Sequence, residues 1–252
     1  MKIQVLGSGT SLGVPEIGCT CPVCTSTNPK DKRMRCSSLV TDGDVRILLD
    51  CGPDFYQQAF NIEYKPLSAV LITHIHYDHV SGLDDLRAFS RLAPVDVYAD
   101  SKTTKALYER MPYCFGKDRY PGSPKIHLHT LALNEMLMVG HIKVIPFKVM
   151  HGQMSIFGYR IGKLAYITDM LTMPEESYET VEGIEILFIN ALRLKSHKTH
   201  QTVEHAIAAA QRIGARETYI IHMNHDFGLH DEMEKFLPAN IHVAYDGMIV
   251  EF

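Results

Sequence analysis

The amino-acid sequence predicts an α+β protein in which two mixed β-sheets are flanked by helices, an αββα arrangement. Three observations lead to this fold class. Strand-like segments occur near both ends of the chain, helical segments stand between them without a strict strand–helix alternation, and turn signals arrive steadily. The 252 residues contain neither an internal repeat nor a linker rich in Pro, Ser or Gly, so residues 1–252 are expected to form a single domain.

The first half of the chain opens with strands and continues with helices. Runs of β-branched and other apolar residues predict strands over Ile3–Leu6, Ser38–Thr41, Val45–Asp50, Ala69–Thr73 and Val95–Ala99. The Asp42-Gly43 pair is typical of a hairpin turn between the second and the third of them. Apolar residues near helical spacing predict a helix over Gly82–Ser90, and Ser101 is expected to cap another helix from Lys102 to Arg110.

The second half continues this mixture of strands and helices without repeating the sequence. Strands are expected over Ile142–Val149, Phe157–Ile161, Leu164–Thr168, Glu185–Asn190 and Thr218–Met223. An apolar stripe over Val203–Ile213, closed by Gly214, predicts a helix, and a shorter helix is expected over Asp231–Leu237. The segment Ile241–Phe252 is expected to end the chain as a hairpin with its turn at Asp246-Gly247.

Composition and charge narrow the classes of function. The formal net charge is −4 and no basic stripe stands out, so long nucleic acid is an unfavourable partner. No apolar run approaches the roughly 18 residues that a membrane span needs. The first residues, MKIQVLGSGT, read as a strand and a glycine turn rather than as a signal peptide. A cytoplasmic location without membrane contact is therefore expected.

Four side chains of metal-ligand type lie within six residues, directly after an apolar strand: His74, His76, Asp78 and His79. His74 and His76 are alternate residues of an extended loop and can point the same way, whereas Asp78 and His79 turn with the start of a helix. One short segment can therefore reach two metal ions a few ångströms apart. Neutral imidazole and carboxylate groups suit zinc, manganese or iron.

Three of the six cysteines, Cys19, Cys21 and Cys24, also fall within six residues. In a reducing compartment such clustering indicates a metal site rather than disulfides. Three thiolates need a fourth ligand to close a tetrahedral zinc site. The sequence offers two candidates for that ligand, the nearby Cys36 and the distant His225.

The HxHxDH segment after a strand resembles the signature of the metallo-β-lactamase superfamily. Further ligand-type residues follow strands in the order that this superfamily shows: His151 in VMHG, Asp169 in LAYITDM and His222 in TYIIHM. The resemblance implies a metallo-β-lactamase-type sandwich with two catalytic metal ions, zinc or manganese. It implies one ion held by His74, His76 and His151, a second held by Asp78, His79 and His222, and Asp169 as the bridge between them. Asp50 in LLDCG matches a position that orients a ligand histidine from behind.

Within this superfamily the chain resembles the PhnP-like phosphodiesterases. The shared features are GSGTSLGVP near the start, the cysteine cluster after the first strand, HMNH at 222–225 and YDGM near the end. The resemblance implies one structural zinc in a small insertion over about residues 18–36. Its ligands would be Cys19, Cys21, Cys24 and His225, which leaves Cys36, Cys51 and Cys114 as core residues.

The same resemblance implies an activity. Members of this branch hydrolyse small phosphodiesters, a cyclic ribose phosphate among them, with a hydroxide that two metal ions generate. The leaving alkoxide needs a proton, and His200 in LRLKSHKTHQTVEH matches the position of the general acid. His197 and His205 are nearby rivals for this role. Asp78 is counted among the catalytic residues together with His200.

Three other functions stay open. A tRNA-processing or single-strand nuclease of the same fold would add a basic arm, whereas the short insertion Tyr113–Ser123 carries few charges. A thioester or lactam hydrolase would use the same water but would not need His200. A non-catalytic zinc-binding or partner-docking protein would be expected to have lost ligands, whereas this chain has a full set. The oligomeric state is also open, with a homodimer as one alternative.

Overall fold

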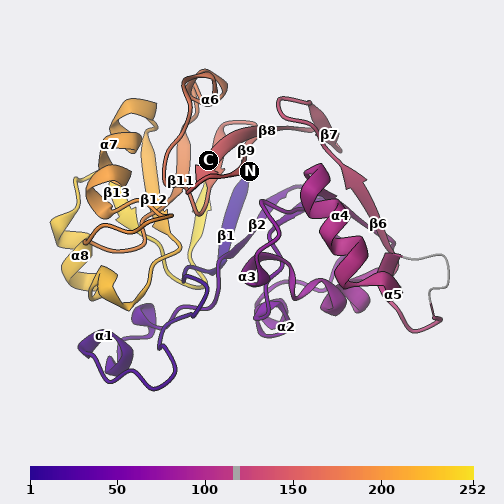
Figure 1. Cartoon of the computed structure of the whole chain (residues 1–252), viewed down its shortest axis with the longest axis horizontal. Coiled ribbons are helices and arrows are strands. Elements are labelled where there is room, and N and C mark those ends of the chain that lie inside the picture. Colours follow the sequence, from indigo (N-terminus) through magenta and orange to yellow (C-terminus); the bar gives the residue numbers. More distant parts are fainter. Residues whose placement is uncertain (116–119) are drawn as a thin grey trace.

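The computed structural model describes residues 1–115 and 120–252. These residues form two seven-stranded mixed sheets that face each other, with helices against both outer surfaces (Figure 1). The predicted αββα sandwich is therefore confirmed. Part of the predicted insertion Tyr113–Ser123, residues 116–119, lies outside the described residues.

The first sheet has the strand order β14-β1-β2-β3-β4-β5-β6. Its strands are β1 (Lys2–Gly7), β2 (Ser37–Asp42), β3 (Val45–Leu49), β4 (Ala69–Leu71), β5 (Val95–Ala99), β6 (Ile126–Thr130) and β14 (Ile249–Glu251). Strands β14, β1, β2 and β3 pair antiparallel, whereas β3 to β6 run parallel. The residues that follow β3 and β4 therefore leave the sheet at the same edge, where open α/β sheets place their ligands.

The second sheet has the order β13-β12-β11-β10-β9-β8-β7. Its strands are β7 (Leu137–Val139), β8 (Ile142–His151), β9 (Met154–Ile161), β10 (Leu164–Ile167), β11 (Ile186–Asn190), β12 (Glu217–Ile221) and β13 (Ile241–Val243). Strands β10 to β13 run parallel, and β7 to β10 pair antiparallel. The carboxyl ends of β10 and β12 thus lie at one edge, separated by β11.

Helices cover the outer face of each sheet (Figure 1). The α-helices are α1 (Pro22–Thr25), α2 (Phe55–Gln58), α3 (Tyr77–Val80), α4 (Ser101–Arg110), α5 (Pro112–Phe115), α6 (Glu175–Thr180), α7 (Val203–Ile213) and α8 (His230–Phe236). Short 3-10 helices span Pro29–Asp31, Ala59–Asn61, Leu83–Arg87, Phe89–Arg91 and His225–Phe227. Phe55, Val80 and Leu107 bury one face of α2, α3 and α4 against the first sheet. Val203 and Met233 do the same for α7 and α8 against the second.

A third apolar layer fills the space between the sheets. Ile3 and Val40 of the first sheet meet Tyr159 and Phe188 of the second, and each is fully buried. The Tyr159 hydroxyl donates a hydrogen bond of 2.7 Å to the carbonyl of Ile72, which follows β4. A buried hydroxyl needs such a partner, and this one ties the second sheet to the loop that carries the histidine cluster.

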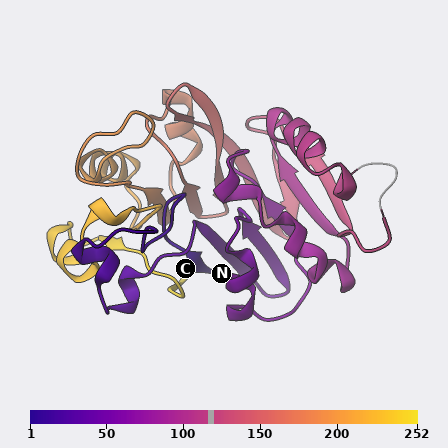
Figure 2. The ribbon, with the colours of Figure 1, turned by 60° about the horizontal axis from the view of Figure 1, so that its bottom comes forward.

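The two ends of the described chain meet at one point of the first sheet. The N-terminal amino group of Met1 donates a hydrogen bond of 3.0 Å to the carbonyl of Phe252, and Figure 2 shows the two ends side by side. Among the described residues, none of the helices is both long and apolar enough to cross a lipid bilayer.

The predicted hairpin over Ile241–Phe252 is wrong. The turn at Asp246-Gly247 exists, but β13 joins β12 in the second sheet and β14 joins β1 in the first. The reason is the Asp246 carboxylate, which accepts hydrogen bonds of 2.8 Å from the Ser8 amide and hydroxyl and 2.7 Å from the Met34 amide. These bonds anchor the turn at the end of β1, so the chain crosses from one sheet to the other.

Three local expectations also need correction. In place of the α-helix predicted over Gly82–Ser90, the chain forms two 3-10 helices, Leu83–Arg87 and Phe89–Arg91. The cap of α4 is Asp100, whose carboxylate accepts a 2.6 Å hydrogen bond from the Thr103 amide, because a carboxylate one residue earlier outcompetes the Ser101 hydroxyl. Strands β6 and β7 were not predicted, since each is short and lies at a sheet edge.

Candidate metal centre

The seven predicted catalytic ligands lie together where β4, β8, β10 and β12 end, although they come from both sheets. Their ligand atoms form two groups, each with all atoms within 4.8 Å of one another. The first group is His74, His76 and His151, and the second is Asp78, His79, Asp169 and His222. The structure thus brings together the residues of each implied ligand set, and Asp169, the predicted bridge, lies with the second set.

In the first group, imidazole nitrogens face one another. His74 Nε2 lies 2.9 Å from His76 Nδ1, and the His151 ring centroid lies 5.1 Å from that of His76. The outer nitrogens have their own partners: Thr73 Oγ1 is 3.0 Å from His74 Nδ1, and the Thr199 carbonyl accepts from His151 Nδ1 at 3.0 Å. A histidine that donates through Nδ1 presents the lone pair of Nε2 inward, as a metal ligand must.

In the second group, two imidazoles face two carboxylates. His79 Nε2 lies 3.1 Å from Asp78 Oδ2 and 3.2 Å from Asp169 Oδ2. His222 Nε2 lies 3.4 Å and 3.2 Å from the same two oxygens. Oδ1 of Asp169 points elsewhere, to His200 Nε2 at 2.9 Å. Ligand atoms of His151, Asp169 and His200 also lie within 4.8 Å of one another, so the Asp169 carboxylate reaches His151 of the first group as well as the second group, as a bridging ligand must.

Asp50 lies directly behind His79. Its Oδ2 accepts the Nδ1 proton of His79 at 2.7 Å, and its Oδ1 accepts the backbone amide of Thr73 at 2.8 Å. Burial raises the pKa of Asp50, while the bonds to His79 and Thr73 oppose that rise. A carboxylate on Nδ1 fixes the tautomer and ring orientation of a ligand histidine, so the contacts suit the orienting role predicted for Asp50.

Backbone strain concentrates at these strand ends. Asp50, Asp169 and His222 have φ angles of 57°, 56° and 57°, in the left-handed region that non-glycine residues seldom adopt. Each residue lies one or two positions past a strand, where this turn directs its side chain into the cluster. The backbone of Gly52 also lies so close to that of Asp78 that no side chain fits, because a Cβ at residue 52 would lie 1.9 Å from the Asp78 carbonyl oxygen. Such strain costs about 1–3 kcal/mol per residue and is retained mainly at functional sites.

The charge of the cluster fits two divalent cations. Asp50, Asp78 and Asp169 bring three carboxylates into a buried space, where isolated charges are costly. Burial opposes the charged form of His79, but the carboxylates of Asp78, Asp50 and Asp169 outweigh burial and hold the pKa of His79 well above its usual range. Among the described residues, His79 Nε2 is completely buried and lies within 3.2 Å of two carboxylate oxygens, but it forms no hydrogen bond of regular geometry with either of them. Two cations held by these nitrogen and oxygen donors would satisfy both the charge and His79 Nε2.

His200 lies at the edge of the cluster, half-buried. Besides the 2.9 Å contact from its Nε2 to Asp169, its ring stacks on that of His222 with the centroids 5.3 Å apart. Burial lowers the pKa of His200, and the Asp169 hydrogen bond opposes this. The rival His197 is one step further out, with Nδ1 3.1 Å from His200 Nδ1. The other rival, His205, faces the Thr202 hydroxyl at the start of α7, 3.2 Å away.

The cysteine cluster closes around His225. The Sγ atoms of Cys19, Cys21 and Cys24 lie 3.1, 3.6 and 3.4 Å from His225 Nδ1. A tetrahedral zinc ion separates its sulfur and nitrogen ligands by about 3.5 Å, so the four atoms can form a zinc site. A hydrogen bond from the Cys24 amide lowers the pKa of Cys21 to about 7, which favours the thiolate that zinc binds. Cys36, the alternative fourth ligand, is instead buried beside the Tyr166 hydroxyl.

Replacing Cys21 with serine is expected to lower both the melting temperature and the metal content of the histidine cluster. His225 follows His222 by three residues, and Asp226 beside it pairs with Arg193 of the loop that leads to His200, at 3.6 Å. Loss of the zinc would therefore loosen both His222 and that loop, with an expected loss of about 10–100-fold in activity or metal affinity. Calorimetry and metal analysis of the purified variant measure both effects.

Cys114→Ser is the matched control for Cys21→Ser. Cys114 is a buried cysteine of α5 outside both clusters, so its replacement should affect stability without changing the metal content. If Cys21→Ser kept the melting temperature and the metal content of the unchanged protein, the coupling between the two sites would be refuted.

Sequence reasoning missed several residues that support the cluster. Thr73 precedes His74 in the chain and could have been noticed as a hydroxyl beside a ligand. Glu16, whose Oε2 lies 3.4 Å from His225 Nε2, lies close to the cysteines in sequence and could also have been found. The Thr199 carbonyl has no sequence signal, because every residue has a backbone oxygen.

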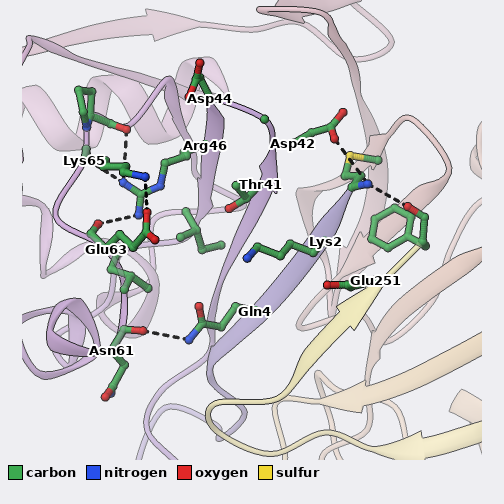
Figure 3. A pocket seen from close by; sticks show the side chains of 16 residues that line it. Lys2, Gln4, Thr41, Asp42, Asp44, Arg46, Asn61, Glu63, Lys65 and Glu251 are labelled. Carbon is green, nitrogen blue, oxygen red and sulfur yellow. Dashed lines mark hydrogen bonds and ion pairs between the residues drawn. The ribbon is translucent and has the colours of Figure 1, made fainter.

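A separate groove of about 1100 Å³ opens on the outer face of the first sheet (Figure 3). It is lined by Lys2, Gln4 and Thr41 of β1 and β2, and Arg46 on its rim donates to the carbonyls of Glu63 and Lys65. Among the described residues, its lining includes none of the predicted site residues. The groove is therefore distinct from the metal centre.

Comparison with known proteins places this fold and site in a family. Residues 45–223 match the family described as "Beta-lactamase superfamily domain". A solved structure described as a new diphosphatase from the PhnP family has a TM-score of 0.93 and 40% sequence identity, over 100% of this chain and 96% of that one. Zinc-bound PqqB from Methylobacterium extorquens has a TM-score of 0.82 over 100% of both chains; at 24% identity it shows the shared fold alone.

A curated relative, named octanoyltransferase, comes from Porphyromonas gingivalis. It is 44% identical over 250 residues, which are 98% of this chain but 51% of that protein. The chain thus spans about half the length of this relative. The superfamily match covers most of the chain, and the PhnP-family structure matches all of it. The chain therefore belongs to the metallo-β-lactamase superfamily and, within it, to the PhnP family.

Proposed function

We propose that this chain is a metal-dependent hydrolase of small phosphodiesters. The observation that carries the proposal is the contact of 2.9 Å between His200 Nε2 and Asp169, which sets a proton donor against the predicted bridging carboxylate. A hydrolase that needs only activated water has no use for such a donor, whereas a phosphodiester with an alkoxide leaving group does. The likeness to a diphosphatase of the same family supports phosphoryl chemistry.

The residues of the cluster have three roles in the proposed reaction: they bind metal, orient the ligands and donate a proton. His74, His76, His151, Asp78, His79, His222 and Asp169 would hold two divalent ions, zinc or manganese. When bound, these ions supply an activated water and positive charge for the phosphoryl oxygens. Asp50 and the Thr199 carbonyl keep His79 and His151 in the tautomer that presents Nε2. His200, as the imidazolium, donates its Nε2 proton to the leaving alkoxide and is left as the neutral imidazole.

The diphosphatase relative supports a second candidate, the hydrolysis of a diphosphate linkage. A phosphate leaving group departs more readily than an alkoxide and depends less on a proton donor. The buried contact of His200 therefore favours the ester over the anhydride. Diphosphate diesters belong in the test because both bonds present a phosphoryl group to the same residues.

The name octanoyltransferase belongs to a protein about twice as long as the matched segment. Acyl transfer through a thiol would need a reactive cysteine close to the metal centre. Cys51 directly follows Asp50 in the chain, and Cys36 lies close enough to interact with the Asp50 carboxylate. Both cysteines are fully buried. Burial raises the pKa of Cys36 to about 12 and holds that of Cys51 well above its usual range, which makes both unreactive.

A substrate screen tests the proposed function. The protein, reconstituted with zinc or manganese, should hydrolyse bis(p-nitrophenyl) phosphate and at least one cyclic alkyl phosphodiester. A thioester and a β-lactam serve as controls and should not react. Turnover of a diphosphate diester in preference to every phosphodiester would favour the second candidate. If the protein hydrolysed only a tRNA precursor, both candidate functions would be wrong and the protein would be a nuclease. The net charge of −4 disfavours that outcome.

A further inference from the structure

Asn190 occupies the end of β11, between the strands that lead to two of the predicted ligands. β11 lies between β10 and β12, and Asn190 pairs in register with Ile221, the residue before His222. On the other side, the parallel ladder with β10 ends at the pair of Ile167 and Ile189. Asn190 is fully buried and lies one residue past that pair.

The side chain of Asn190 continues the sheet where the backbone of β10 leaves it. The Met170 amide donates to Asn190 Oδ1 at 2.8 Å, and Asn190 Nδ2 donates to the Met170 carbonyl at 3.0 Å. The carboxamide thus makes both hydrogen bonds that a neighbouring strand would make. Because Asp169 turns the chain away with a φ of 56°, the buried backbone of Met170 depends on this amide.

Gln201 ties the loop that carries His200 to the same point. Its backbone amide donates to the Met170 carbonyl at 2.9 Å, and its Nε2 donates to the Asn190 carbonyl at 2.6 Å. Gln201 is 2% exposed. It directly follows His200, just as Met170 directly follows Asp169. The carboxylate of Asp169 and the imidazole of His200 are therefore each one residue away from a single buried network.

We propose that Asn190 and Gln201 are positioning residues that fix the Asp169 carboxylate and the His200 imidazole relative to each other. Both side chains bond to the backbone rather than to the reacting groups, so their effect passes through Asp169 and His200. Two consequences follow. Loosening the network should weaken metal retention through Asp169, and it should impair proton donation through His200. The second consequence rests on the proposed function, and the first does not.

Gln201→Ala and Gln58→Ala form a matched pair for the test. Gln58 is 1% exposed, and its Nε2 donates to the Arg35 carbonyl at 2.9 Å, so each variant removes one buried amide bonded to a backbone carbonyl. The measurements are the melting temperature, the rate at which zinc passes to a chelating dye, and kcat for an alkyl and a p-nitrophenyl phosphodiester. Gln201→Ala should release zinc about 10–100-fold faster and lose more kcat on the alkyl ester than on the aryl ester. Gln58→Ala should lower the melting temperature without either effect.

Asn190→Asp supplies the same comparison if Gln201→Ala does not fold. It keeps the size of the side chain and the acceptor for the Met170 amide, but it loses the donor to the Met170 carbonyl. If Asn190→Asp and Gln58→Ala changed zinc release equally, the positioning role would be overturned. If the unchanged protein hydrolysed neither phosphodiester, the proposed function would fail, while zinc release would still decide whether the network holds Asp169.

Discussion

Replacing His200 with alanine is expected to lower kcat for an alkyl phosphodiester by about 10²–10⁴-fold, the usual contribution of a general acid. An alkoxide is a poor leaving group, and His200 Nε2 is the proton-bearing atom that contacts the predicted bridging carboxylate, at 2.9 Å from Asp169. KM should change little, because proton donation matters in the transition state and hardly at all in substrate binding. Steady-state kinetics with a colourless alkyl ester give both constants, if an added phosphomonoesterase frees inorganic phosphate from the monoester product for a phosphate assay.

The leaving group supplies the control for His200→Ala. A p-nitrophenolate departs without a proton, so the same variant should lose far less activity on bis(p-nitrophenyl) phosphate. His197→Ala is the matched histidine variant, because His197 lies 3.1 Å from His200 but further from the ligand groups. It should retain the larger part of the activity on both esters. Equal losses of His200→Ala on the alkyl and the aryl ester would contradict proton donation and leave His200 as a support for Asp169.

The metal centre could be predicted from the sequence because the HxHxDH segment, and the order of the later ligand-type residues after strands, resemble the metallo-β-lactamase pattern. His74, His76, His151, Asp169 and His222 each come at or just after the end of an apolar run. Strand ends gather at the edges of sheets, so a set of ligand-type residues at such positions predicts convergence even before the strand order is known. The short spacing within HxHxDH placed the two groups side by side.

The supports of the cluster could not be predicted in the same way. The Thr199 carbonyl acts through a backbone atom, and Asn190 acts through a bond to the backbone of Met170. Neither residue type is unusual at its position. The Asn190 contact depends on how β10 and β11 end, and the Thr199 contact depends on how the loop before α7 meets the end of β8. No glycine marks the left-handed φ angles of Asp50, Asp169 and His222, and the moderate preference of Asp and His for this region is too weak to predict them.

The hairpin predicted at Asp246-Gly247 is wrong for a similar reason. A turn sequence between two short apolar runs is typical of a hairpin, and the local pattern favours that structure. The structure instead uses the Asp246 carboxylate to bind Ser8 and Met34, which are remote in sequence. Long-range hydrogen bonds of this kind decide whether a turn joins two strands of one sheet or connects two sheets.

Replacing Asp169 with alanine is expected to abolish measurable phosphodiester turnover and to leave fewer metal ions bound per chain. Removal of a supporting residue near a metal typically costs about 10–100-fold, and Asp169 is predicted to be a ligand itself, so its loss should exceed about 100-fold. Its two oxygens face His79, His222 and His200, and all three contacts would disappear together. Metal analysis after dialysis and steady-state kinetics measure the two effects.

Zinc-dependent stability separates loss of a ligand from loss of the fold. A metal that binds only the folded protein stabilises it by about 4 kcal/mol when its free concentration is a thousandfold above Kd, so the melting temperature should rise with zinc. For Asp169→Ala this rise should shrink, while Asp96→Ala, which removes a partly exposed carboxylate on β5, should keep it. An Asp169→Ala protein with undiminished zinc stabilisation would show that the carboxylate is not a metal ligand, and that zinc is held without it.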